Sequence, residues 1–113
     1  LDFVTVKYDK DGNQLWARFD DSWGKDDNAM DIAVDYDGYV YVTGWGYMPK
    51  FPQQAVATYK YSPSGNLEWR QFYVWARNEE AVAVVVERLF NVYVVGTSLN
   101  HDRMFTLQYD QTP

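Results

Sequence analysis

The sequence contains no cysteine and only one histidine, His101. The absence of cysteine excludes disulfide bonds, thiolate zinc sites and thiol nucleophiles, and it leaves the redox compartment open. One histidine without cysteine also argues against a zinc centre or a histidine-dependent catalytic triad. We therefore expect His101 on the surface, no enzymatic activity, no catalytic residue and no cofactor.

Basic residues are also few. Ten Lys and Arg stand against 16 Asp and Glu, which gives a net charge of −6 and a pI near 4.5. A surface that binds nucleic acid or anionic lipid needs clustered Lys and Arg. No run of apolar residues approaches the ~18 that a membrane-spanning helix requires. The expected partners therefore exclude nucleic acid, and we expect no membrane insertion.

Helical periodicity is missing as well, because no segment repeats apolar residues at spacings of three and four over roughly ten or more positions. Aromatic residues, in contrast, make up 19% of the chain, with ten Tyr, six Phe and five Trp. Such rings bury large areas, so they can build a core without long helices or line a recognition surface. We expect most of them to pack inside a β fold.

The stretch 31–44, DIAVDYDGYVYVTG, is typical of a β-hairpin. Its two runs, 32–34 and 40–42, consist of residues that favour strands. Between them, Asp35 can accept hydrogen bonds from nearby backbone, and Gly38 can adopt a positive φ without a Cβ clash. The chain is predicted to reverse direction here.

Much of the sequence occurs twice. KYDKDGNQLWARF at 7–19 recurs as KYSPSGNLEWRQF at 60–72 with an offset of 53 residues. VYVTG at 40–44 recurs as VYVVG at 92–96 with an offset of 52, so one deletion separates the two halves. A third copy begins with TLQYD at 106–110, which matches TVKYD at the start of the chain. A period of about 50 residues indicates a repeat architecture.

Each unit contains four candidate strands, which in the first unit are 3–8, 15–19, 29–34 and 40–44. The first alternates with a period of two, as a strand requires. In the third, AMDIAV, small residues alternate with large ones, which suggests that both faces of the sheet meet another sheet. Four antiparallel strands in about 50 residues, with apolar positions on both faces, are typical of a β-propeller blade.

The patterns KYDxxGNxLW at 7–16 and IAVDxxGxVYVTG at 32–44 resemble the bacterial and archaeal β-propeller repeat family, which is often found in large extracellular and cell-surface proteins. The resemblance covers nearly the whole chain. It implies an all-β fold with the IAVD strand innermost, VYVTG next, KYD third and LW outermost. The chain would then hold an outer half-blade at 1–19, a full blade at 29–73 and a partial blade at 81–109.

Counting strands adds a constraint. Nine predicted strands make two blades and one further strand, whereas a closed propeller needs about four to eight blades. The expected partners are therefore further propeller blades, supplied by identical copies in a ring or by a longer chain. The strand 104–109 repeats the role of 3–8, and this redundancy favours the longer chain.

One turn departs from the pattern. In the second copy, VVVERLFN at 84–91 has neither the Asp nor the Gly of the first hairpin. We expect this hairpin to turn differently, with Asn91 in the left-handed region.

Candidate binding residues lie on the longer connections, 20–28, 45–54, 74–80 and 97–101. These connections are predicted on one face of the disc, opposite the tight turns, where a rigid scaffold usually carries its functional groups. Their aromatic residues are the candidates for ligand binding: Trp23, Trp45, Tyr47, Phe51 and Trp75. Beside the carboxylates of Asp26 and Asp27 they could stack on sugars or contact a protein. Alternatively, they seal the loops against the neighbouring blade.

No metal site is expected. The Asp-rich turns 9–13 and 35–38 offer oxygen ligands, but neither belongs to a twelve-residue calcium loop that ends in Glu. The acidic pairs at 20–21, 26–27 and 79–80 are adjacent in sequence, which does not define two carboxylates across a glycosidase cleft.

Three functions remain open. The first is a non-catalytic propeller scaffold of a secreted or cell-surface protein that presents loops for protein or glycan binding. The second is a lectin-like ring assembled from identical short chains. The third is a piece of a larger propeller enzyme whose catalytic residues are not in this chain.

Overall fold

The computed structural model describes residues 3–20, 28–47, 54–73, 79–87, 91–98 and 103–109. Within these ranges the regular structure is β-strand throughout. None of the described residues belongs to a helix with the length and hydrophobicity that crossing a bilayer requires. The strands are β1 (Phe3–Tyr8), β2 (Gln14–Asp20), β3 (Asn28–Val34), β4 (Val40–Tyr47), β5 (Gln54–Tyr61), β6 (Leu67–Tyr73), β7 (Glu79–Val86), β8 (Val92–Ser98) and β9 (Arg103–Tyr109).

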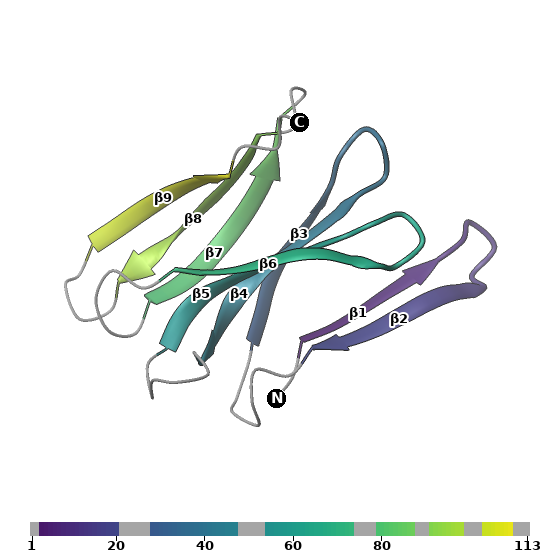
Figure 1. Cartoon of the computed structure of the whole chain (residues 1–113), viewed down its shortest axis with the longest axis horizontal. Helices are drawn as coiled ribbons and strands as arrows, with labels where there is room; N and C mark the ends of the chain where they lie inside the picture. Colours follow the sequence, from purple (N-terminus) through teal and green to yellow (C-terminus); the bar gives the residue numbers. More distant parts are fainter. Residues whose placement is uncertain are drawn as a thin grey trace.

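These strands form three antiparallel sheets. The first sheet holds β1 and β2, the second β3-β4-β5-β6 and the third β7-β8-β9, each in chain order. The sheets lie side by side in the order of the sequence, with the second between the other two (Figure 1). The all-β fold and the order of strands in the four-stranded sheet follow the predictions from the sequence.

The strand β4 is longer than predicted. It continues three residues beyond Gly44, because its backbone ladder with β5 extends from Val40 opposite Tyr61 to Tyr47 opposite Gln54. Trp45 and Tyr47 therefore belong to a strand, and the prediction that they lie on a connection is wrong.

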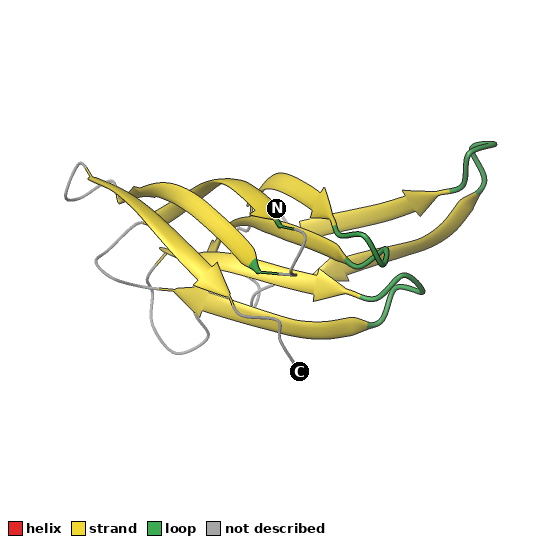
Figure 2. Cartoon of the chain, turned by 90° about the horizontal axis from the view of Figure 1, so that it is seen from above, coloured by secondary structure: helices red, strands yellow, loops and turns green. Residues whose placement is uncertain are grey.

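The tight turns share one hydrogen-bond frame. In the turns that begin at Asp9, Asp35 and Ser62, the first residue donates its N–H to the carbonyl oxygen four residues later, at 2.8 to 3.0 Å. The fourth residue of each turn is a glycine with a φ of about +90°, a conformation that other residues adopt only with strain. These three turns project from the same end of the strands (Figure 2).

The divergent turn keeps this frame. The N–H of Glu87 donates to the carbonyl oxygen of Asn91 at 3.0 Å, four residues on, and the Asn91 side chain donates to the Glu87 carboxylate. Residues 88–90 at its centre lie outside the described part of the chain. The hairpin therefore has the same length as the others without the Asp or the Gly that the first one uses.

Asp35 connects its turn to the core. One carboxylate oxygen accepts hydrogen bonds from the backbone N–H groups of Asp37 and Tyr39, and the other accepts the buried hydroxyl of Tyr41 at 2.9 Å. Burial of the Tyr41 ring, followed by its hydrogen bond to Asp35, raises the pKa of Tyr41 above its ordinary value. The turn that starts at Asp35 is thus held by a side chain of the following strand.

Gly44 allows β3 and β4 to approach closely. The register of β3 shifts between Ala29 and Asp31, and Gly44 lies opposite this bulge. A Cβ atom on Gly44 would overlap the carbonyl oxygen of Asn28 and would lie 2.9 Å from the Cα atom of Ala29. The equivalent shift occurs in β7 between Ala81 and Ala83, opposite Gly96.

We expect Gly44→Ala to destabilise the chain by about 3 kcal/mol, because the obstructing atoms are backbone and cannot rotate away. Gly12→Ala is the matched control. A Cβ on Gly12 meets no atom within 4 Å, so this change costs only the strain of a positive φ, about 1 kcal/mol. Urea unfolding measures both, and equal losses would contradict the close approach of β3 and β4.

We expect Tyr41→Phe to lower the free energy of unfolding at neutral pH by about 1 kcal/mol, because the change leaves a buried carboxylate oxygen without its hydroxyl partner. In the native protein the pKa of Tyr41 is raised above the unfolded value of about 10. The stability from this shift is full below pH ~10 and is lost as the pH rises further. Tyr41→Phe should therefore make the alkaline loss of stability shallower than in the unmodified chain, as measured by urea unfolding at several pH values.

Candidate functional site: sheet interfaces, strand ends and an open groove

The first interface joins the first and second sheets. Phe3 and Trp16 pack against a cluster on the second sheet: Val40, Val42, Ala57, Tyr59 and Tyr61. The ring centroids of Phe3 and Tyr59 lie 4.9 Å apart with an edge-to-face tilt of 74°. Those of Trp16 and Tyr61 lie 5.9 Å apart with a tilt of 39°. Aromatic contacts of this kind add to the free energy of burial, so this interface depends on rings from both sheets.

Polar contacts hold the turn 62–66 of the second sheet against the first sheet. The carbonyl oxygen of Pro63 accepts hydrogen bonds from Lys7 Nζ at 2.9 Å and from Trp16 Nε1 at 3.0 Å. The carbonyl oxygen of Gly65 accepts a bond from Arg18 Nε at 2.5 Å. A Cβ on Gly65 would lie 2.8 Å from Trp16 Cγ. The turn therefore needs a glycine both for its φ and for this close contact.

The second interface joins the second and third sheets. Its buried residues are Tyr41, Val56, Val84, Val92 and Val94. Asp31 Oδ2 accepts a hydrogen bond from the backbone N–H of Val84 at 2.9 Å, which links β3 directly to β7.

The same aromatic pair occurs at both interfaces. Trp69 and Tyr109 stand one repeat after Trp16 and Tyr61, respectively. Their centroids lie 5.4 Å apart, again with a tilt of 39°. Each sheet therefore packs on the next with equivalent residues in equivalent positions, which is the geometry of a stack of repeated units.

The family comparison agrees with this geometry. Residues 24–47, which include β3 and β4, match the family model described as Beta-propeller repeat. This segment is therefore similar to a β-propeller repeat. No curated protein matches the chain. The second sheet, which contains the segment, has four antiparallel strands, as a propeller blade does, and the described strands of the first and third sheets repeat parts of the same pattern.

The ends of the strands away from the tight turns include two of the predicted binding residues. Trp45 is partly buried near the end of β4, between Asn28 of β3 and Val56 of β5. Tyr47 is the last residue of β4, and its backbone pairs with Gln54. The other three candidates, Trp23, Phe51 and Trp75, lie outside the described residues, as do Asp26, Asp27 and His101.

The acidic turns use their carboxylates for the turn itself. Asp9 accepts backbone hydrogen bonds from Asp11 and Asn13 and a side-chain bond from Asn13. The backbone bond from Asn13 is the main reason why the pKa of Asp9 lies below its ordinary value. In the part of the chain that the structure describes, no three His, Cys, Asp or Glu side chains are grouped so that they could hold a metal ion.

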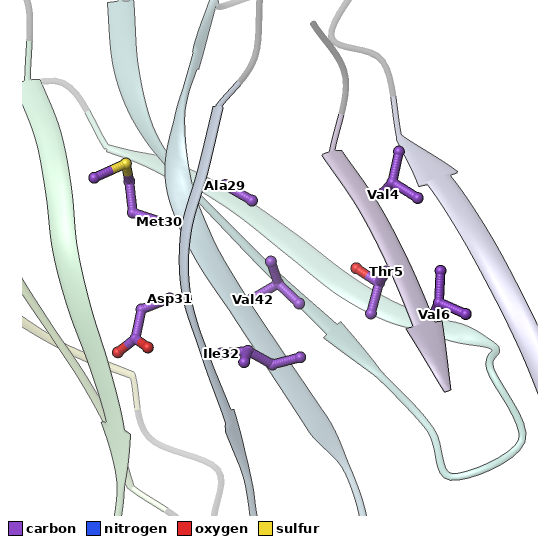
Figure 3. Close-up of a pocket in the computed structure, with 8 residues that line it drawn as sticks. All are labelled: Val4, Thr5, Val6, Ala29, Met30, Asp31, Ile32 and Val42. Carbon is purple, nitrogen blue, oxygen red and sulfur yellow. The ribbon is translucent and has the colours of Figure 1, made fainter. Parts of the chain in front are cut away.

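A groove that sequence reasoning missed runs between β1 and β3 (Figure 3). One part has a volume of about 470 Å³, and Thr5 of β1, Ile32 of β3 and Val42 of β4 are among its lining residues. A second part of about 310 Å³ shares Thr5 and Ile32 and extends to Tyr8 and Val34. We call the two parts the β1–β3 groove. A sequence signal existed in Ile32 and Val34, two apolar residues that alternate along β3 and therefore share one of its faces.

We expect Trp16→Leu and Tyr61→Leu to be coupled by about 0.5–1.5 kcal/mol in a double-mutant cycle, because the two rings contact each other across the first interface. The Trp69 and Tyr109 pair should give a similar coupling. Trp16 with Tyr109, which belong to different interfaces, should be additive. Urea unfolding of the single and double variants provides the measurement, and strong coupling in the mixed pair would contradict the repeated geometry.

Proposed function

We propose that the chain is a non-catalytic β-propeller scaffold in a secreted or cell-surface protein, where it presents loops for protein or glycan binding. The observation that carries the proposal is the repeated stacking of the sheets. Equivalent Trp–Tyr pairs at 5.9 and 5.4 Å hold successive blades in the same relative position. A rigid stack of this kind presents the connections between its strands at a regular spacing.

The two ends of the strands differ in what they can offer a partner. At one end each tight turn spans five residues, and its polar side chains accept hydrogen bonds from the backbone of the same turn. At the other end the connections vary in length from four residues at 99–102 to seven at 21–27, and their sequences contain Trp23, Phe51 and Trp75. Aromatic rings are the side chains that stack on sugars and anchor protein contacts, so the binding surface is assigned to this second end.

The location rests on the resemblance to repeats that are often found in extracellular and cell-surface proteins. The absence of cysteine and the net charge of −6 are compatible with this location. The further partners are other propeller blades, in the same longer chain or in identical copies.

A lectin-like ring of identical chains is the second candidate. It is favoured by the exposed apolar residues on the outer faces of the stack, such as Tyr8 on the first sheet and Met104 on the third. Their equivalents at the internal interfaces, Tyr61 and Val56, are buried. Size-exclusion chromatography with light scattering separates the two candidates, because a ring has a defined mass several times that of the chain.

We expect the double variant Trp23→Ala, Trp75→Ala to weaken binding to an immobilised glycan panel or to immobilised extracellular-matrix proteins by at least about tenfold, in proportion to the loss of two anchor residues. Tyr36→Ala is the matched control, because Tyr36 is 91% exposed on a tight turn at the opposite end. Circular dichroism confirms that both variants are folded. If the parent chain binds neither panel, or if Tyr36→Ala has the larger effect, the assignment of the binding surface is wrong.

A further inference from the structure

The strand β1 has a free edge. Among the strands that the structure describes, β1 pairs with β2 alone. Its equivalent in the second sheet, β5, pairs with β6 on one side and with β4 on the other. All described pairs between β1 and β2 match those between β5 and β6 at an offset of 53 residues. The edge of β1 that faces the β1–β3 groove is therefore the one that β4 occupies on β5.

Two side chains of β3 that line the groove are also exposed to solvent. Ile32 is 53% exposed and Val34 59% exposed. Their equivalents in β7 are Val84, which is only 3% exposed, and Val86, which packs against the second interface. The sequence positions correspond, so the difference in burial comes from the neighbour that each strand has.

The second interface shows which neighbour covers this position. Val84 belongs to a cluster with Tyr41 of β4, and Ala33 of β3 packs against the same cluster. Tyr41 and Ala33 belong to one hairpin, β3–β4, which is also the hairpin that pairs with β5. The β3–β4 hairpin therefore makes two kinds of contact. It covers the apolar face of the third sheet, and its strand β4 pairs with β5 in the second sheet.

We propose that the β1–β3 groove binds an antiparallel β-hairpin of the propeller-repeat pattern, whose second strand adds to the free edge of β1. The hairpin belongs to a further propeller repeat and not to a second copy of the described strands. Both hairpins of that pattern in this chain already pair with another strand, since β4 pairs with β5 and β8 pairs with β9.

The two internal examples agree on the register. Val40 lies opposite Tyr61 and Val92 opposite Tyr109, while Gly44 lies opposite Ala57 and Gly96 opposite Phe105. By equivalence, the strand that enters the groove places its first valine opposite Tyr8 and its glycine opposite Val4.

The ladder residues also give the entering strand a specific contact. Lys60 lies opposite Tyr41, with its Nζ atom 5.5 Å from the centre of that ring and 4.5 Å from the ring of Tyr39. A cation near an aromatic face is stabilising. Lys7 occupies the equivalent position on β1, where the hydrogen bond from its Nζ atom to Pro63 holds the cation in place. A hairpin with tyrosine at this register position is therefore preferred over one without it.

The first experiment uses the full chain and a synthetic hairpin peptide that copies residues 28–47. Because the chain has no cysteine, one engineered thiol on each partner reports the register. Thr43 and Thr58 face each other with their hydroxyl oxygens 3.0 Å apart, so Thr5→Cys in the chain should pair with Thr43→Cys in the peptide. In a glutathione redox buffer we expect at least about tenfold more of this mixed disulfide than with Lys7→Cys, which lies two residues out of register.

Ile32→Asp provides the test of the groove itself. The residue is half exposed in the chain, so a charge there should leave the fold intact, which circular dichroism checks. We expect it to weaken peptide binding, measured by fluorescence anisotropy, by at least about tenfold. Val85→Asp is the matched control, with a similarly exposed valine on the third sheet, and it should leave the affinity unchanged.

An isolated hairpin is only marginally stable in water, so a tethered form keeps the proposal falsifiable if the free peptide binds too weakly to measure. A copy of residues 28–55 placed directly before Phe3 supplies the hairpin in the same chain. We expect hydrogen exchange of the β1 amides to slow by at least about tenfold and that of the β9 amides to stay the same.

Three results would overturn the proposal. The first is unchanged hydrogen exchange of the β1 amides in the tethered form, and the second is an equal disulfide yield at both cysteine positions. The third is a dimer of the unmodified chain that Ile32→Asp abolishes, because a second copy would then occupy the groove. The proposal depends on the propeller repeat but not on what the loops bind, so its failure and that of the proposed function are distinguishable.

Discussion

A sheet that carries apolar side chains on both faces is stable only when both faces are covered. The strand β5 shows this constraint most directly. Its Val56 faces the third sheet and its Tyr59 faces the first, and both side chains are completely buried. Burial of this kind is the main favourable contribution to folding. At β5 the four-stranded sheet therefore has no solvent-facing side, and its stability depends on the sheets on either side of it.

The contacts between blades repeat as closely as the strands within them. Each blade supplies a tryptophan from its last strand, and the next blade supplies a tyrosine from its third strand, so the relative position of two blades is encoded in the repeat itself. At the first interface the turn 62–66 adds hydrogen bonds from Lys7, Trp16 and Arg18. Directional bonds of this kind fix the offset between sheets, which apolar packing alone leaves less defined.

Much of the fold could be predicted from the sequence. The Asp35–Gly38 turn, the strands on either side of it and the order of strands in the blade all follow from local chemistry and from the repeat. The end of β4 could not, because Trp45 between two glycines is typical of a loop, whereas the ladder with β5 keeps the segment extended. Pairing with a neighbouring strand overrides local preference in such cases.

The contacts between sheets were beyond sequence reasoning. A repeat aligns Trp16 with Trp69, but it does not tell which residue of the next sheet stands opposite each ring. That depends on the offset between sheets, which arises from the packing of all the side chains at once. Of the predicted binding residues, Trp45 and Tyr47 lie at one end of the blade, and Trp23, Phe51 and Trp75 stay predictions.

The copies of the repeat keep their tight turns at one length and differ in length elsewhere. The offset between the copies is 53 residues from β2 to β6, 52 from β3 to β7 and 48 from β5 to β9. Every change in offset falls between strands that are joined at the end opposite those turns, and none falls within a turn. One rim of the stack is thus kept at constant length, while the other gains and loses residues without disturbing the ladders. Foreign segments grafted at that second rim would find the most tolerant positions in the molecule.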